Sequence, residues 1–197
     1  MSDLSRPVQP SLILIRGLPG SGKSSLASAL ADRLGRENVA ILDPDHIDQD
    51  SAEYKSLCDQ LTDEGVDPKF FPNRFLKAKG YQAIAANKVI IWNQAFTDFG
   101  GFSRSVASLQ DYAAEHGTDL PALLVEVEID PATAKERVRA RSGRGGHSVP
   151  EDTFARFIAD YQSFADKGHT AVIVNGNDSA DASAATVLSA LGQIQKT

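Results

Sequence analysis

The sequence has one cysteine, one tryptophan and no excess of positive charge: its 197 residues carry a net charge of −6. A single cysteine excludes an internal disulfide framework and a zinc site built from several cysteines. The acidic balance argues against long nucleic acids as partners, because such binders usually carry a basic surface. No apolar run reaches the ~18 residues that a transmembrane helix needs, and residues 1–10 lack the apolar core of a signal peptide. We therefore expect a cytoplasmic protein with a short flexible arm, residues 1–10, and no membrane contact.

The most informative stretch, Gly17 to Ser24, reads Gly-Leu-Pro-Gly-Ser-Gly-Lys-Ser. It matches the pattern G-x-x-x-x-G-K-[ST] of the phosphate-binding P-loop. The apolar run at residues 12–15 precedes it, as expected for a buried parallel strand. Apolar residues at helical spacing follow it, up to Gly35, which is suited to end a helix. This order of strand, loop and helix is the context that the motif requires, so the sequence predicts a nucleotide-binding protein.

The residue types of this loop suit phosphate chemistry. Its glycines let the backbone turn tightly, so that consecutive N–H groups and the start of the helix face an anion. Lys23 supplies a positive charge to the β- and γ-phosphates, and Ser24 offers a hydroxyl to Mg²⁺. We expect the nucleotide to contact the whole loop and the residue after it: Gly17, Leu18, Pro19, Gly20, Ser21, Gly22, Lys23, Ser24 and Ser25.

Strand-like runs alternate with helix-like runs along the chain, which is typical of a parallel sheet with helices on both faces. We predict an α/β three-layer sandwich of the P-loop NTPase type, with about five mainly parallel strands, in a single domain covering residues 1–197. Ligands should gather at the carboxyl ends of the strands. The expected strands are residues 12–15, 39–42, 89–92, 122–129 and 171–174.

The second strand runs directly into Asp43, Pro44 and Asp45. A carboxylate at this strand end lies close to the γ-phosphate, where it can accept a proton from an attacking hydroxyl. Asp45 is our first choice for this base. Asp43 is the second choice, with water-mediated binding of Mg²⁺ as its other role, and His46 is a candidate wall residue of the substrate site. The alternative is an ordinary Asp-Pro turn with solvated carboxylates.

Residues 43–87 are expected to form a substrate-side cap, with helices near residues 52–61 and 72–86. Between residues 43 and 69, nine acidic side chains accompany only two lysines. Such a run usually forms a solvated face, and the alternative is a pocket that prefers a neutral or cationic substrate. Arg74 is a candidate substrate contact, or else a surface charge. Asn93 and Thr97, after the third strand, are candidates to contact substrate or order Mg²⁺-bound water, and Gly100-Gly101 predicts a flexible loop before a helix from Arg104.

The fourth strand is followed by a helix that carries Arg137 and Arg141 on one face. This helix breaks in a glycine-rich turn, after which Ser148 to Glu151 has the pattern of a capping box that opens a new helix. We predict a hinged lid, residues 137–151, whose arginines, including Arg144, stabilise a moving phosphoryl group. The alternative is that these cations complement a helix C-terminus.

The last strand is followed by Asn177, at the place where many nucleotide binders contact the base.

Together, three of the stretches described above resemble the P-loop kinase group that holds the zeta-toxin-like and polynucleotide-kinase-like proteins. They are residues 17–24, residues 42–45 (Leu-Asp-Pro-Asp), and Arg137 and Arg141 with residues 145–151. The resemblance spans Leu12 to Leu191. It implies that Asp45 is the catalytic aspartate and that the arginines bind phosphates. Where that family often has an arginine, three residues past the aspartate, this chain has Asp48.

We therefore predict a phosphotransferase that uses Mg²⁺ and ATP, with GTP as the alternative donor. Its predicted acceptor is a hydroxyl of a small molecule, such as an antibiotic, a nucleoside, a sugar derivative or a sugar nucleotide. A polynucleotide 5′-hydroxyl kinase and a non-catalytic nucleotide-dependent switch are the alternatives. The resemblance to zeta toxins also raises an antitoxin-like protein partner, which no feature of the sequence supports.

Overall fold

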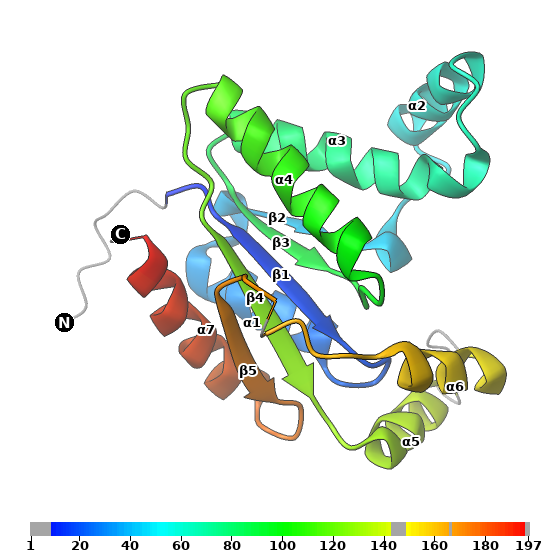
Figure 1. Cartoon of the computed structure of the whole chain (residues 1–197), viewed down its shortest axis with the longest axis vertical. Helices are drawn as coiled ribbons and strands as arrows, with labels where there is room; N and C mark the ends of the chain where they lie inside the picture. The colour runs from blue at the N-terminus through cyan, green and yellow to red at the C-terminus, as the bar shows by residue number, and fades with distance from the viewer. Residues whose placement is uncertain (1–8, 143–148, 166, 196–197) are drawn as a thin grey trace.

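Five parallel strands form one sheet with helices on both faces in the computed structural model, which describes residues 9–142, 149–165 and 167–195 (Figure 1). This arrangement confirms the predicted α/β sandwich of the P-loop NTPase type. The sheet order is β2-β3-β1-β4-β5. The strands are β1 (Leu12–Gly17), β2 (Val39–Leu42), β3 (Val89–Asn93), β4 (Ala122–Glu128) and β5 (Ala171–Asn175).

The central strand β1 is buried along its whole length, because helices cover both faces of the sheet. Its residue Ile13 stands opposite Ile91 of β3 and Leu123 of β4. Gly17 is the last residue of the strand and the first of the predicted P-loop. The P-loop therefore begins at the carboxyl edge of the sheet, between the ends of β3 and β4.

Alternate side chains of the strands supply two separate apolar layers. Leu12, Leu14 and Trp92 pack on one face, against α3 (Phe71–Ala85) and α4 (Phe99–Glu115). Ile13 and Ile91 pack on the other face, against α1 (Lys23–Leu34) and α7 (Ala180–Ile194). Each fully buried side chain of this size contributes about 1.5–3 kcal/mol to folding, so the two layers hold the strand ends rigidly in place.

Of the remaining helices, the two between β4 and β5 lie near the carboxyl ends of β1 and β4, and the one between β2 and α3 lies beside α3 (Figure 1). The α2 helix (Ala52–Asp63) lies between β2 and α3 in the chain, and α5 (Pro131–Ser142) and α6 (Glu151–Asp160) lie between β4 and β5. A small apolar cluster joins α5 and α6 to the P-loop, and it consists of Leu18, Ala134, Val138 and Phe154. No helix in the described ranges is long and apolar enough to cross a membrane.

Two predicted helix starts were wrong. The α4 helix begins at Phe99, because the Asp98 side chain accepts hydrogen bonds from the N–H groups of Gly100 and Gly101 at 3.0 and 2.9 Å. This cap offsets the low helix propensity of the two glycines. The α6 helix begins at Glu151, with Pro150 as its N-cap and no side-chain cap. A proline disfavours helical backbone in the residue before it, which delays the start. The predicted capping residue Ser148 lies outside the described residues, as do residues 1–8 of the predicted arm.

Candidate active site

The P-loop backbone turns at glycines that other residues could replace only with strain. Gly20 has a φ of 84° and Gly22 a φ of 101°, in the left-handed region that favours glycine. A Cβ at Gly20 would also lie 2.4 Å from the carbonyl oxygen of Ala134 in α5. Gly22 is the N-cap of α1, which begins at Lys23. The first N–H groups of α1 are therefore available at this loop to an anion such as phosphate.

The Lys23 ammonium group lies over the loop, where its Nζ donates to the carbonyl oxygens of Gly17 and Leu18, both at 3.0 Å. Burial lowers the pKa of Lys23 to about 8, against the opposing effect of the Asp45 and Asp43 carboxylates. These electrostatic contributions mean that the lysine and both predicted carboxylates lie within reach of one another. A bound phosphate would favour the charged form of the lysine.

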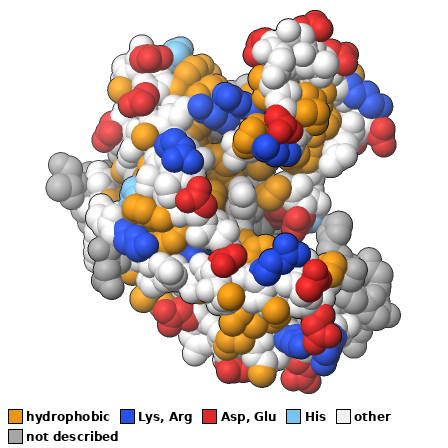
Figure 2. All heavy atoms as spheres, turned by 45° about the vertical axis from the view of Figure 1, so that its right-hand side comes forward, with side chains coloured by type: hydrophobic (Ala, Val, Ile, Leu, Met, Phe, Trp, Pro, Cys, Tyr) orange, Lys and Arg blue, Asp and Glu red, His pale blue; other side chains and the backbone are white. Residues whose placement is uncertain are grey.

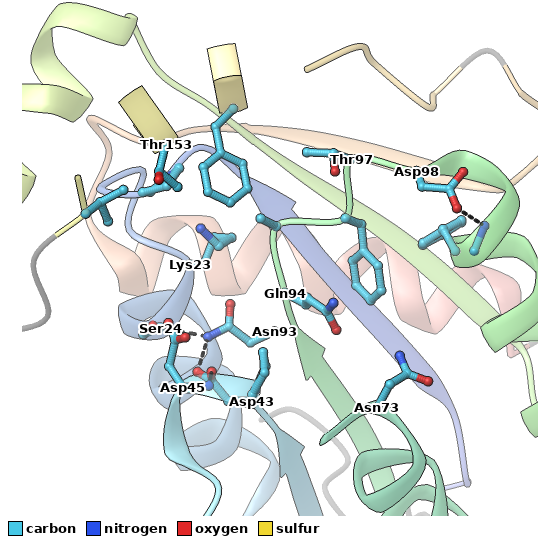
Figure 3. Close-up of a pocket in the computed structure, with 18 of the residues that line it drawn as sticks. Lys23, Ser24, Asp43, Asp45, Asn73, Asn93, Gln94, Thr97, Asp98 and Thr153 are labelled. Carbon is cyan, nitrogen blue, oxygen red and sulfur yellow. Dashed lines mark hydrogen bonds between the residues drawn. The ribbon is translucent and has the colours of Figure 1, made fainter. Parts of the chain in front are cut away.

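Asp43, Asn93 and Ser24 form a hydrogen-bonded cluster at the ends of three adjacent elements (Figure 3). The Asn93 Nδ2 donates to Asp43 Oδ2 at 2.5 Å and to Ser24 Oγ at 3.1 Å. The other Asp43 oxygen accepts from the backbone N–H of Asp45 at 2.9 Å, and His46 Nδ1 lies 3.1 Å from Asp43 Oδ2. Asp43 is thereby fixed in one orientation, with both of its oxygens engaged.

This cluster fits a hydrated Mg²⁺ ion. The buried Asn93 Oδ1 has no hydrogen-bond partner in the part of the chain that the structure describes, so it is an available acceptor for a water molecule. Hydroxyl, carboxylate and amide oxygens are the ligands that suit Mg²⁺, which keeps several waters and binds through few protein groups. Within the described residues no group of three or more His, Cys, Asp or Glu side chains could hold a metal by itself.

A cavity of about 1260 Å³ opens at this edge of the sheet. It exceeds the ~300–1,000 Å³ of a usual small-molecule pocket, so it has room for a nucleotide and a second substrate. Figure 2 shows the surface hollowed between the part of the molecule with α2 and α3 and the part with α5 and α6. The predicted residues that line the cavity are Pro19, Gly20, Gly22, Lys23, Ser24, Ser25, Asp43, Asp45, Arg74, Asn93, Thr97, Arg137 and Arg141.

The other predicted residues lie elsewhere. Leu18 packs into the cluster with α5 and α6, and Ser21 is buried beneath the loop. His46 lines a second cavity, which shares Ser24, Asp43 and Asn93 with the first. Asn177 lines a third cavity beside β5. Arg144 lies outside the described residues, together with the glycine-rich part of the predicted lid.

Arg137 links α5 to the turn after β5. Its guanidinium donates to the carbonyl oxygen of Gly176 at 2.7 Å and to Asn177 Oδ1 at 2.9 Å. Arg141 lies one turn further along α5, also on the cavity wall, and its charge contributes to lowering the pKa of Lys23. The two arginines therefore lie on the same wall, Arg137 bound to the β5 turn and Arg141 close to the P-loop lysine.

The acidic run of residues 43–67 does not face the cavity as a whole. Asp43 and Asp45 are its only members on the described cavity wall. Basic side chains reach the same wall instead: Arg74 and Lys77 from α3, and Arg104 from α4. The described cavity wall therefore does not support the expectation of a neutral or cationic substrate.

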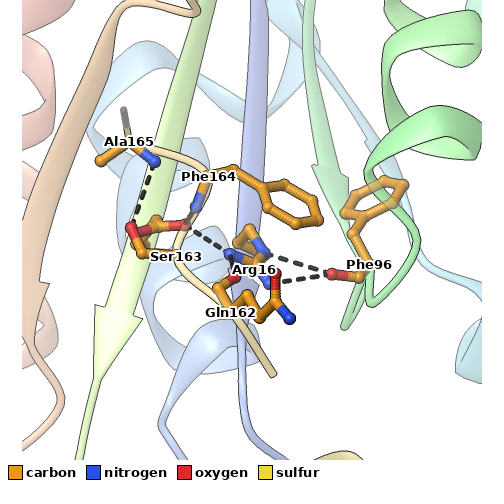
Figure 4. A network of polar contacts seen from close by, with 7 residues as sticks. Arg16, Phe96, Gln162, Ser163, Phe164 and Ala165 are labelled. Carbon is orange, nitrogen blue, oxygen red and sulfur yellow. Dashed lines mark hydrogen bonds and ion pairs between the residues drawn. The ribbon is translucent and has the colours of Figure 1, made fainter. Parts of the chain in front are cut away.

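A buried ion pair beside the P-loop escaped the sequence analysis. Arg16, the residue before Gly17, is fully buried and pairs with Glu126 of β4. Its Nε and Nη2 donate to the carbonyl oxygen of Phe96, at 3.2 and 3.0 Å, and its Nη1 donates to the carbonyl oxygen of Gln162 at 2.7 Å (Figure 4). Charged residues within two otherwise apolar strands were the signal that could have revealed it.

The Arg16 guanidinium is also enclosed by aromatic rings. It lies 3.6 Å from the ring centre of Phe164 and 4.3 Å from that of Tyr161. Burial raises the pKa of Tyr161 to about 12. Glu126 accepts further hydrogen bonds from the N–H of Phe164 at 2.7 Å and from Ser163 Oγ at 2.5 Å. The ion pair therefore joins the end of β1, the loop after β3 and the segment after α6.

Solved structures with the same fold include several enzymes. A gluconokinase from Sinorhizobium meliloti 1021 is 19% identical, with a TM-score of 0.59 over 95% of this chain and 94% of that one. The Deinococcus radiodurans tunicamycin resistance protein is 17% identical, with a TM-score of 0.58 over 93% and 96%. Chaetomium thermophilum Kti12, in complex with ADP-AlF3, is 16% identical, with a TM-score of 0.60 over 93% and 98%.

No curated protein matches the chain by sequence. A family model described as "AAA domain" matches residues 12–164, which include the P-loop, the Asp43–Asn93–Ser24 cluster, α5 and α6. The more specific likeness to zeta toxins stays a prediction. The chain has the P-loop NTPase fold and belongs to this AAA domain family.

Proposed function

We propose that the chain is an ATP- and Mg²⁺-dependent phosphotransferase that transfers the γ-phosphoryl group to a hydroxyl of a small molecule. The observation that carries the proposal is the contrast between two nearby carboxylates. Asp43 is buried and engaged by Asn93, whereas Asp45 is exposed on the wall of the cavity that Lys23 also lines. One carboxylate is thus suited to orient a metal, and the other is free to meet an acceptor.

Different residues of the chain have different roles in the proposed reaction. The P-loop N–H groups and Lys23 bind the phosphates. Ser24, with Asp43 and Asn93 through water, would hold Mg²⁺, which neutralises phosphate charge when bound. Asp45 accepts the proton of the acceptor hydroxyl. The oxygen of that hydroxyl bonds to the γ-phosphorus, while the bond between the γ-phosphorus and the oxygen that leaves with ADP breaks. Arg141, with Arg137 beside it, stabilises negative charge on the transferred group.

Relatives of the same fold support transfer to a hydroxyl. They include a gluconokinase, a sugar kinase and a deoxyadenosine kinase by name. Their identities to this chain are 14–19%, so they support the reaction type and leave the acceptor to be found by experiment. A panel of hydroxyl compounds, scored by ADP release and by a mass gain of one phosphoryl group, identifies it.

The Asp45→Asn variant tests the role of the base. We expect its affinity for ATP to stay within about twofold of the parent and its phosphoryl transfer to fall by about 10²–10⁴-fold, the usual contribution of a positioned base. Asp48→Asn is the matched control, because Asp48 is an exposed aspartate of the same segment that does not line this cavity. Transfer by Asp45→Asn at the parent rate would show that another group accepts the proton.

A nucleotide-dependent switch is the second candidate function. It is favoured by the similarity to Kti12, which is described with ADP-AlF3 and without a kinase name. A switch would bind ATP and change conformation without transferring phosphate to any compound of the panel. In that case Asp45→Asn would leave nucleotide-dependent conformational change intact, which hydrogen exchange of the loaded and unloaded protein measures.

A further inference from the structure

We propose that the acceptor carries an anionic group, a carboxylate or a phosphate, which is bound by Arg74 and Lys77 of α3 and by Arg104 of α4. The inference rests on the proposed function, because it concerns the second substrate of that reaction. Figure 3 shows Asn73, the neighbour of Arg74, beyond Gln94 as seen from Lys23 and Ser24. The three cations line the cavity from α3 and α4, and not from the P-loop or α1.

The charge of the cavity is opposite to that of the chain. Six basic and three acidic side chains line it among the described residues, whereas the whole chain has a net charge of −6. Lys23, Arg137 and Arg141 lie on the nucleotide side, where phosphates need them. The other three cations share the rest of the wall with Asp98 and with Asp45, the proposed base. A cavity of one sign attracts ligands of the other.

The lysines of residues 43–87 that do not line this cavity all have acidic partners. Lys55 lies 3.1 Å from Asp50, Lys69 lies 2.7 Å from Asp67, and Lys79 pairs with Glu53. The same region contains further acidic side chains that could pair with additional cations. Pairing is thus the rule for basic side chains of this region outside the cavity.

Arg74 and Lys77, the two basic residues of that region that line the cavity, are exceptions. Arg74 and Lys77 have no acidic partner within the described ranges, and the Lys77 Nζ lies only over the Tyr81 ring, 5.6 Å from its centre. Like charges three residues apart on a helix repel each other. A bound anion would relieve this repulsion and supply the partner that both side chains lack.

Arg104 approaches the cavity from the facing helix α4. Its closest acidic group is Asp98, at 3.8 Å. Both oxygens of Asp98 already accept the N–H groups of Gly100 and Gly101 as the cap of α4. The Arg104 guanidinium therefore keeps donors for a ligand, and a guanidinium binds carboxylate or phosphate in a bidentate manner.

The neighbouring side chains indicate what else the acceptor contains. Asn73, Gln94 and Ser105 also line the cavity and offer hydrogen bonds to hydroxyl groups. Phe70, which is 50% exposed, offers an apolar surface at the rim. We infer a small polyhydroxy or ring compound with one anionic substituent.

Inorganic sulfate is the first probe, applied to the full chain saturated with Mg²⁺ and a non-hydrolysable ATP analogue so that the P-loop is filled. We expect saturable NMR shifts of the backbone amides of residues 73–77 and 104, and their loss in the Arg74→Gln/Lys77→Gln double variant. The double variant Lys55→Gln/Lys79→Gln is the matched control, because it removes the same charge from paired lysines of α2 and α3. Absence of the shifts, or equal shifts in the Arg74/Lys77 variant, would overturn the proposal.

Matched acceptors are the second probe: gluconate against glucitol, and nucleoside 3′-phosphates against nucleosides. We expect transfer to the anionic members, with a KM about tenfold or more higher in the Arg74/Lys77 variant and kcat within about twofold. Equal transfer to the neutral members would overturn the anion site and leave the kinase proposal intact. A preference for a 5′-hydroxyl oligonucleotide over every small compound would overturn the small-molecule acceptor. Failure to bind the ATP analogue would instead overturn the proposed function.

Discussion

Asp43 and Asp45 show how two carboxylates separated by one proline acquire different environments. Asp43 caps the single-turn helix Pro44–His46, accepting the N–H of Asp45. Its other oxygen meets the Asn93 amide, so it is held in place. Asp45 belongs to the helical turn itself, and its side chain extends into the cavity. Sequence analysis treated the Asp-Pro turn as the alternative to a catalytic site. The turn is instead what directs the two side chains into different environments.

The lowered pKa of Lys23 predicts how nucleotide affinity depends on pH. Its free-state pKa is about 8, and bound phosphates favour the charged form, so above pH about 8 binding must take up a proton. We expect the affinity for ADP to fall by up to about tenfold per pH unit above that value and to be nearly flat below it. Calorimetric titrations between about pH 7 and about pH 9.5, in buffers of different ionisation enthalpy, measure both the affinity and the proton uptake.

The Lys23→Arg variant is the control for this pH dependence. A guanidinium stays charged throughout this range, so its affinity should not change with pH, whatever its absolute value. A parent protein with constant ADP affinity up to about pH 9.5 would mean that the lysine keeps its ordinary pKa in the loop.

Among the structural elements, the loop after β3 is held by the buried side chain of Arg16. Phe96 has a φ of 34°, an unfavourable conformation for a bulky residue. Two N–H groups of Arg16 hold its carbonyl oxygen there. The same loop brings Gln94 and Thr97 to the cavity wall. The buried Arg16 therefore holds a loop that lines the cavity, although Arg16 is not itself a lining residue.

A double-mutant cycle tests this buried pair. We expect Arg16→Met to lower the free energy of unfolding by about 3–5 kcal/mol, because it leaves the Glu126 carboxylate buried without its cation. The double variant Arg16→Met/Glu126→Leu should recover much of that loss, since neither charge remains. Urea unfolding of the four proteins measures the coupling. Additive losses would mean that the two side chains contribute independently.

The strands were predictable almost to the residue, as were the starts of α2 and α3, whereas the starts of α4 and α6 were not. A buried parallel strand is an apolar run with polar ends, as at residues 89–92 between Lys88 and Asn93, so composition alone marks it. The start of α4 depends on which side chain caps it, and Asp98 does so across two glycines that looked like a loop. The unpaired state of Arg74 and Lys77 was also beyond sequence analysis, because it depends on which face of α3 meets the cavity.

For the whole molecule, the sheet order decides which predicted site residues meet. Because β3 lies between β1 and β2, Asn93 at its end bridges Ser24, after β1, and Asp43, after β2. Sequence analysis identified all three residues as candidates from their positions at strand ends. It could not specify that the asparagine is the central member, because the order of strands across a sheet follows from long-range packing.

The separation of the apolar clusters predicts that α5 and α6 respond differently from the sheet to the loss of a buried side chain. Phe154 is 3% exposed and belongs to the small cluster with Leu18, Ala134 and Val138, apart from the two sheet layers. We expect Phe154→Ala to cost about 3–5 kcal/mol locally and to speed amide hydrogen exchange in residues 131–142 and 151–160. Exchange in β1, β3 and β4 should stay slow.

Mass spectrometry, with and without Mg-ADP, measures the amide exchange rates of these segments in the parent and in Phe154→Ala. Ile158→Ala is the control, because Ile158 lies on the same helix and is 40% exposed, so it should change exchange little. Leu18 connects the small cluster to the P-loop. ADP affinity should therefore fall in Phe154→Ala while the sheet stays folded. Equal loss of protection in the central strands would show instead that α5, α6 and the sheet unfold as one cooperative unit, and that the P-loop gains its order from the whole fold.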